Sequence, residues 1–299
     1  IRAAPRFIIR RFARIFPLHL AILSAMLLFA VALLVSGRDP GAHYSFAELP
    51  AHYLLVQNWG FGNGLTWNDP AWSISTEWAA YLLLAVAGSW LTRLRIGAWS
   101  FPVLILVMAA TLGWWFAATG RTSIGNDIPA TGLLRCLVEF GMGIILCQWW
   151  TAQRERSHGA AIIYGTALGF AGIGALLLAA AAQPAAIPLI MTAIVILALQ
   201  ASTAPRPLLS GRIAQWLGDI SYAVYLSHFF LWILFKLFFV DDPAIVHPVK
   251  ILAFVLLTLA VSHLLHITLE VPGRRIAQRA GDRLLTARLP VFAAGRGET

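Results

Sequence analysis

The chain of 299 residues is poor in charge, in cysteine and above all in lysine. Only 12% of its residues are charged, about half the share in an ordinary soluble domain, while 59% are hydrophobic. A soluble globule of this length cannot bury so much apolar surface, and a disordered chain is far more polar. The composition therefore excludes both classes and indicates an integral membrane protein.

The two cysteines, Cys136 and Cys147, lie in the same apolar stretch. Along a single helix they are about three turns apart, which is too far for a disulfide bond. We interpret both as packing residues, and they carry no information about the redox compartment.

Long apolar stretches make up most of the chain. A helix needs about 20 apolar residues to cross the hydrocarbon core of a bilayer. The sequence contains eight such stretches, at 16–36, 71–90, 98–118, 128–150, 159–181, 184–202, 217–240 and 248–270. Asp69 and Pro70 predict the start of the second span, and Pro272 with Gly273 predicts the end of the last. The predicted fold is all-α, a polytopic transmembrane helical bundle with about eight spans.

The net charge of +9 comes from 20 arginines and 2 lysines against 13 carboxylates. These basic residues lie in short runs between the apolar stretches and not on a soluble domain, so we expect no nucleic-acid partner. With eight spans, 17 arginines fall on the side of the two termini and four basic residues fall on the opposite side. The positive-inside rule then places both termini in the cytoplasm, with the basic tail on the anionic inner leaflet.

The connection at 37–70 is the longest between two predicted spans, and we expect it on the external side. It is rich in polar and aromatic residues: His43, His52, Asn58, Trp59, Trp67 and Asn68. The chain shows no repeat at a fixed period and no inverted pair of broken helices.

Ionisable side chains inside spans are costly in a bilayer and are therefore candidate functional groups. Glu77 has no partner in its own helix, and Ser73 precedes it on the same face, so we interpret Glu77 as a site residue, with a structural ion pair as the alternative. Arg135 and Glu139 are four residues apart on one helix face and can neutralise each other. We expect this pair to be structural.

His228 is predicted near the middle of its span, and Ser221 and Tyr225 share its helix face. This polar stripe favours a site, and a hydrogen-bonded packing histidine is the alternative.

His263, His266 and Glu270 also share a predicted helix face, which raises the possibility of a metal site. Membrane enzymes that bind metal through histidines need several such groups and this chain offers one, so we predict no metal. Glu270 is expected to form a charge pair with Arg274 and Arg275.

The arginines Arg10, Arg11 and Arg14 precede Pro17 at the predicted cytoplasmic mouth of the first span. They set topology, and arginines there can also grip phosphates through bidentate, charge-assisted hydrogen bonds. The sequence has no phosphate-binding glycine loop, nucleophile elbow or H-E-x-x-H motif.

Five segments, in order, resemble motifs of the acyltransferase 3 family of integral membrane O-acyltransferases. They are Arg10–Pro17, Trp72–Trp78, Arg135–Gly143, Leu217–His228 and Glu270–Pro272. The resemblance implies a complete fold of ten helices and transfer of an acyl group, usually acetyl, from acyl-CoA to a hydroxyl. It also implies that the acceptor is commonly a glycan.

The resemblance further assigns roles to individual residues. Glu77 and His228 are the catalytic candidates that line the transfer cavity. The residues implied in substrate binding are Arg11, Arg14, Ser73, Ser221 and Tyr225. Family members begin with two further helices, the first of which bears an arginine and a histidine thought to be the catalytic pair. We therefore expect 1–272 to be an N-terminally incomplete acyltransferase domain that lacks the family's base, followed by a basic cytoplasmic tail at 273–299.

The predicted function is a membrane-bound O-acyltransferase of the inner (cytoplasmic) membrane, with acyl-CoA as donor substrate and no bound cofactor. Its expected partners are the lipid bilayer, acyl-CoA and a saccharide or other cell-envelope glycan. One alternative is a transporter of a small solute or an acyl group, with Glu77 and His228 as relay groups, although transporters typically carry internal repeats. The other is a catalytically inactive membrane scaffold.

Overall fold

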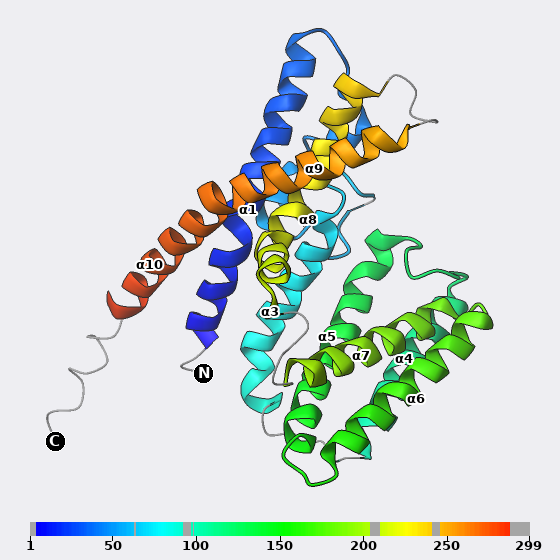
Figure 1. The fold of residues 1–299 in the computed structure, drawn as a ribbon. Coiled ribbons are helices and arrows are strands. Elements are labelled where there is room, and N and C mark those ends of the chain that lie inside the picture. The colour runs from blue at the N-terminus through cyan, green and yellow to red at the C-terminus, as the bar shows by residue number, and fades with distance from the viewer. Residues whose placement is uncertain are drawn as a thin grey trace, which may run out of the picture. The chain divides into compact units, whose positions relative to one another are not determined.

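The computed structural model describes residues 4–62, 64–91, 97, 99–203, 210–240 and 246–287. Within these ranges the structure is helical and contains no β-strand (Figure 1). Seven helices in the described ranges are long and apolar enough to cross a membrane. The prediction of an all-α, polytopic membrane protein is confirmed.

The long helices lie close to the predicted spans. In chain order they are α1 (Ala4–Val35), α3 (Ala71–Leu91), α4 (Ser100–Ala118), α5 (Ile128–Gln153), α6 (Gly159–Ala179), α7 (Gln183–Ser202), α8 (Arg212–Phe239) and α9 (Pro248–Leu265). Helix α3 forms at the position of the second predicted span but is not one of the seven apolar helices. Its first half carries a run of polar residues: Ser73, Ser75, Thr76 and Glu77.

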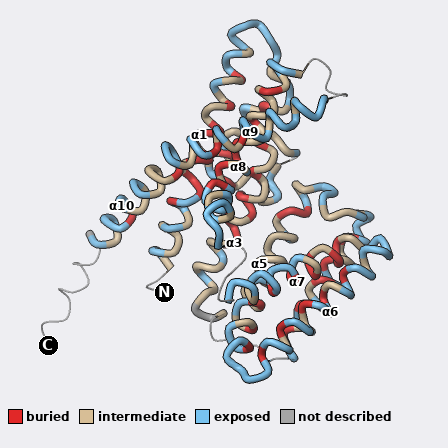
Figure 2. The backbone as a smooth tube through the Cα atoms, in the orientation of Figure 1, coloured by how far each residue is buried: buried red, intermediate tan, exposed pale blue. Residues whose placement is uncertain are grey.

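The chain folds as two compact units. Unit 1 consists of Ile1–Gly88 and Gln215–Thr299, and unit 2 of Ser89–Ala214. The core of unit 1 is a cluster of aromatic and aliphatic side chains from α1, α3, α8 and the 37–70 connection. Figure 2 marks buried residues along the backbone in red. The core of unit 2 joins α4, α5, α6 and α7, and in it α6 and α7 pack closely because Gly174 leaves room for Ile190.

The connection at 37–70 folds against the helices of unit 1, and its placement on the external side of the membrane stays a prediction. It contains a 3-10 turn, η1 (Ala42–Tyr44), and the short helix α2 (Leu49–Leu54). The ring of His19 in α1 donates from Nε2 to the carbonyl of His52 across 2.8 Å. Because His19 lies about 24 Å from the end of α1 at 1.5 Å per residue, the segment folds back deep along α1. Hydrogen bonds to the helices satisfy part of the buried polar groups of the segment, such as Nδ2 of Asn68, which donates to the carbonyl of Leu226 across 3.0 Å.

The last predicted span does not end at Pro272. After α9 the helix continues through a π-helical turn, η3 (His266–Glu270), into α10 (Val271–Ala287). Proline cannot donate a backbone hydrogen bond, and the π turn directly before it accommodates this loss without breaking the helix. The expected end at Pro272 and Gly273 is therefore wrong.

Helix α10 packs against the first half of α1. A Cβ atom on Gly273 would lie 2.6 Å from Pro17, and one on Gly281 would lie 2.4 Å from Ile9. These two glycines permit the close approach of the helices. The predicted basic tail thus includes an ordered helix, while 288–299 lie outside the described residues.

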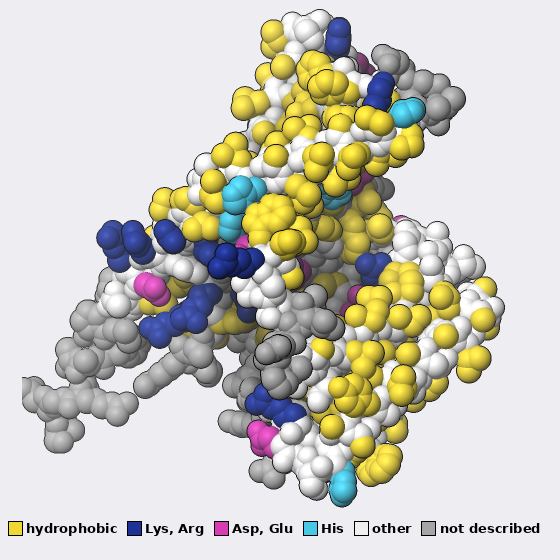
Figure 3. Space-filling model, viewed as in Figure 1, with side chains coloured by type: hydrophobic (Ala, Val, Ile, Leu, Met, Phe, Trp, Pro, Cys, Tyr) yellow, Lys and Arg dark blue, Asp and Glu magenta, His cyan; other side chains and the backbone are white. Residues whose placement is uncertain are grey.

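Arginines gather over α10 and the start of α1 (Figure 3). Most are exposed: Arg6, Arg10, Arg14, Arg275, Arg279 and Arg283. The charge count of the sequence also included arginines that lie outside the described residues, namely Arg2, Arg93, Arg95, Arg206, Arg288 and Arg296.

Candidate functional site

In unit 1, the 37–70 connection is hydrogen-bonded to the start of α3 through Ser75. The Ser75 hydroxyl donates to the carbonyl of Leu55 across 2.9 Å and accepts from the backbone N–H of Asn58 across 3.2 Å. The indole of Trp59 donates to the Ser75 carbonyl across 2.9 Å. These bonds fix the first turns of α3 and so position Ser73 and the carboxylate that follows it.

Ser73 and Tyr225, predicted as members of two separate polar stripes, lie together in the structure. Their hydroxyl oxygens are 2.6 Å apart, and the Tyr225 hydroxyl donates to the carbonyl of Pro70 across 2.6 Å. Tyr225 also lines an open groove on α8, together with Ser221 and His228. The structure therefore brings together four of the predicted site residues.

His228 is held by its own helix. Its Nδ1 lies 2.8 Å from the carbonyl oxygen of Tyr225 and 3.1 Å from that of Val224. Since carbonyl oxygens only accept hydrogen bonds, Nδ1 carries the proton and Nε2 is left as the proton-accepting atom. This tautomer fits a general base at the edge of the groove.

Glu77 belongs to a second cluster, formed by α1 and α3. Its carboxylate accepts a hydrogen bond from the hydroxyl of Tyr81. The guanidinium of Arg11 lies 4.9 Å from the centre of the Tyr81 ring, in cation–π contact. Glu77 is not among the residues that line the groove of His228.

Tyr222 joins α8 to α1, and sequence reasoning missed it. Its hydroxyl donates to the carbonyl of Ile15 in α1 across 2.7 Å. A single tyrosine gives no signal in the sequence because its partner lies 207 positions away.

Glu270 does not form the expected charge pair. Its carboxylate is 2% exposed and lies 2.9 Å from Nδ1 of His266, and within the described ranges no ion pair joins it to Arg274 or Arg275. His266 and Glu270 thus remain in contact within the π turn, while His263 in α9 accepts a hydrogen bond from the indole N–H of Trp216. Among the described residues, no group of three or more histidine, cysteine, aspartate or glutamate side chains is placed to hold a metal ion.

A third polar group, also missed, surrounds His52 in α2. Its Nε2 lies 2.8 Å from the hydroxyl oxygen of Thr66, which donates to the carboxylate of Glu48 across 2.6 Å. The Thr66 proton is used in that second bond, so Nε2 of His52 donates and its Nδ1 is bare. Burial and the neighbouring rings of His19 and His43 lower the pKa of His52 to about 4, and the ring is neutral at pH 7.

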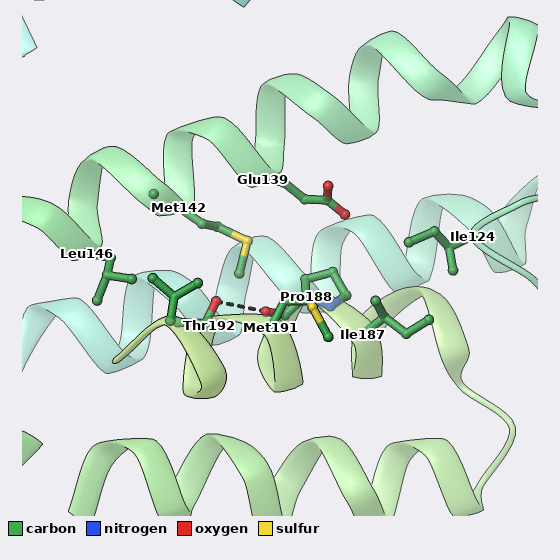
Figure 4. Close-up of a pocket in the computed structure, with 10 residues that line it drawn as sticks. Ile124, Glu139, Met142, Leu146, Ile187, Pro188, Met191 and Thr192 are labelled. Carbon is green, nitrogen blue, oxygen red and sulfur yellow. Dashed lines mark hydrogen bonds between the residues drawn. The ribbon is translucent and has the colours of Figure 1, made fainter. Parts of the chain in front are cut away.

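Unit 2 contains the predicted Arg135–Glu139 pair. Nε of Arg135 lies 3.7 Å from Oε1 of Glu139, and Arg135 also donates to the carbonyl of Ile124 across 2.6 Å. Figure 4 shows Glu139 and Met142 on the side of α5 that faces α7, at a pocket of about 250 Å³. Its lining is otherwise apolar, apart from the Thr192 hydroxyl, which donates to the Pro188 carbonyl across 2.7 Å. The structural role of the pair stays a prediction.

A model of a known protein family, described as an acyltransferase domain, matches residues 2–267. No curated protein and no solved structure matches the chain. The match covers both units and four of the five segments that carry the resemblance, while Glu270–Pro272 lies just beyond its end. The chain therefore belongs to the acyltransferase 3 family of membrane acyltransferases.

Proposed function

We propose that the protein transfers an acyl group, most simply acetyl, from acyl-CoA to a hydroxyl of a saccharide or other cell-envelope glycan. The family match over residues 2–267 carries this proposal. The polar clusters around Ser73, Glu77, Tyr225 and His228 all fall inside the matched region. The asymmetry of arginine along the chain supports an inner-membrane location with both termini in the cytoplasm.

The reaction needs a base, an oxyanion partner and close approach of two substrates. A base takes the proton of the acceptor hydroxyl, the oxygen attacks the thioester carbonyl, and hydrogen-bond donors stabilise the oxyanion. The intermediate then collapses, the C–S bond breaks, and CoA leaves as the thiol after taking the proton from the base. We assign the base to Nε2 of His228. The paired hydroxyls of Ser73 and Tyr225 are suited to orient the acceptor beside it.

The donor side of the proposal rests on the arginines of α1. Arg14 is exposed, and Arg11 lies on the Tyr81 ring next to Glu77. The phosphates of CoA carry several negative charges that guanidinium groups bind well. We assign Arg11 and Arg14 to the donor and Glu77 to the cavity in which the acyl group is transferred.

The test is release of free CoA from acetyl-CoA by membranes that contain the protein, with glycans offered as acceptors. We expect acceptor-dependent CoA release and acylated glycan. His228→Ala should lower kcat at least about 100-fold because it removes a general base. His263→Ala is the matched control, since that ring contacts Trp216 outside the groove, and it should stay within about threefold of wild type.

Other outcomes would replace the proposal with one of the alternatives. Uptake of a solute or acyl group into vesicles without thioester cleavage would establish a transporter. The absence of both CoA release and uptake would indicate an inactive scaffold.

A further inference from the structure

A small polar cavity lies between the segment 52–69 and the first turn of α3. His52, Gln57, Asn68, Asp69 and Trp72 are among the residues that line it. Two of its lining residues are sequence neighbours of the Ser73–Tyr225 pair: Trp72 precedes Ser73, and Asp69 precedes Pro70, whose carbonyl accepts from Tyr225. The cavity has room for about one water molecule or one hydroxyl group.

Three of the side chains around the cavity have their donor ends already engaged. Nε2 of Gln57 donates to the carbonyl of Ala71 across 3.2 Å, and Nδ2 of Asn68 donates to the carbonyl of Leu226 across 3.0 Å. Nε2 of His52 donates to Thr66 across 2.8 Å. These bonds fix which end of each amide and which imidazole nitrogen is left over.

The ends left over are all hydrogen-bond acceptors. In the described part of the chain, Oε1 of Gln57, Oδ1 of Asn68 and Nδ1 of His52 are buried and have no hydrogen-bond partner. His52 is 4% exposed and Asn68 is 2% exposed. Buried acceptors without a donor are unfavourable, so the cavity favours a small group that supplies O–H donors.

We propose that this cavity is a subsite for a hydroxyl group of the acyl acceptor, which donates to the bare acceptor atoms of His52, Gln57 and Asn68. The identity of the ligand as the acyl acceptor rests on the proposed acyl transfer, but binding of a hydroxyl group in the cavity does not depend on catalysis. His52 is in this sense a binding residue, and Thr66 with Glu48 positions its ring.

Binding is tested directly on the full chain in nanodiscs with ¹⁵N-labelled histidine. Glycerol is the hydroxyl probe, and the His52 signal is assigned by its loss in His52→Gln. We expect glycerol to shift the Nδ1 resonance of His52. The fully O-methylated ether 1,2-dimethoxyethane, which has no donor, should leave it unchanged.

Three results of the titration would overturn the subsite. The first is an unchanged His52 resonance with glycerol, which would leave a hydration site only. The second is an equal shift with dimethoxyethane. The third is tighter binding of ethylammonium than of glycerol, which would indicate a pocket for cations.

Kinetics with acetyl-CoA and glycerol provide the second arm. His52→Gln keeps an amide donor for Thr66 but loses Nδ1, so the KM for glycerol should rise at least about tenfold while the KM for acetyl-CoA is unchanged. The control is His43→Gln in the same segment, whose amide can keep the 2.7 Å bond to the Trp67 carbonyl and which should retain both KM values. A wild-type KM for glycerol in His52→Gln would refute the subsite.

The two arms separate this inference from the proposed function. Glycerol binding at His52 without any thioester cleavage would leave the subsite standing and reject the acyltransferase assignment. Thioester cleavage with an unaltered acceptor KM in His52→Gln would do the reverse.

Discussion

The two units of the chain differ in what they bury. Among described residues, unit 1 buries ten polar or charged side chains: His19, His52, Asn58, Asn68, Ser75, Thr76, Ser227, Thr258, Ser262 and Glu270. Unit 2 buries three: Thr131, Gln153 and Thr192. Buried polar groups are costly unless they are hydrogen-bonded, and they are retained where they serve a site. Within the described residues, buried polar groups are thus concentrated in unit 1, while the interior of unit 2 is mainly apolar, which supports the proposed placement of the site in unit 1.

The largest expected contrast is between two carboxylates, one in each unit. Glu77→Gln should lower acyl transfer at least about 100-fold, roughly 3 kcal/mol of transition-state stabilisation, if unit 1 holds the site. Glu139→Gln makes the same change beside Arg135 and should stay within about threefold of wild type. Both are measured as CoA release per folded protein. Equal losses of activity in the two variants would contradict the proposed placement of the site in unit 1.

In unit 2, two glycines of α6 provide a contrast in stability rather than in activity. A Cβ atom on Gly174 would lie 2.6 Å from Ile190 and 3.2 Å from the carbonyl oxygen of Ala186. Gly174→Leu should therefore destabilise the protein by about 2–3 kcal/mol, seen as a lower Tm in detergent. Gly172 has nothing within 4 Å of its Cβ position, so Gly172→Leu should melt like wild type. A large loss of kcat in Gly174→Leu, at a temperature where it is folded, would assign unit 2 a part in the reaction.

Unit 1 should be sensitive to acid through His52. The pKa of its ring is about 4 in the folded chain and 6.5 in the unfolded chain. Between these values the unfolded chain binds a proton that the folded chain does not, so stability falls as the pH falls through this window. From pH 7 to pH 5 we expect a loss of about 2 kcal/mol.

The control for this prediction is His52→Gln, which should lose correspondingly less stability on acidification. Taking the difference from wild type isolates His52 from the other titratable groups around it, namely His19, His43, Glu48 and Asp69. An identical pH dependence in the variant and in wild type would contradict the prediction.

The smallest expected effect concerns the donor. Replacing Arg11 and Arg14 together by Gln should raise the KM for acetyl-CoA about tenfold, close to 1.4 kcal/mol. The same double change at Arg154 and Arg156 in unit 2 also removes two arginines, both exposed, and should leave the KM unaltered. An unchanged KM in the first variant would reduce Arg11 and Arg14 to a role in membrane topology.

The helices were predictable from local sequence, because apolar length and capping residues act within a few turns. The span predicted at 71–90 is Ala71–Leu91 in the structure, and the predicted start at 128 agrees with Ile128. The fold of the 37–70 connection was not predictable, because its hydrogen bonds join residues far apart in the sequence. The bond from Asn68 to the carbonyl of Leu226, for example, joins residues 158 positions apart. The connection's density of amides, histidines and tryptophans with little charge was the available signal.

The candidate site was predictable only in part, and for a similar reason. Helical periodicity placed Ser221, Tyr225 and His228 on one face, and the structure keeps them there. Periodicity cannot show that Ser73 meets Tyr225, because that contact depends on how two helices pack. It also failed at Glu270, where the π turn interrupts the α-helical period.

The π turn η3 also determines which side of the following helix, α10, faces α1. It places one more residue in the turn than an α-helix would, and each residue rotates an α-helix by about 100°. Without the extra residue, Gly273 and Gly281 would rotate away from Pro17 and Ile9, and bulkier side chains would face α1. A single additional residue thus decides which stripe of the last helix meets the first.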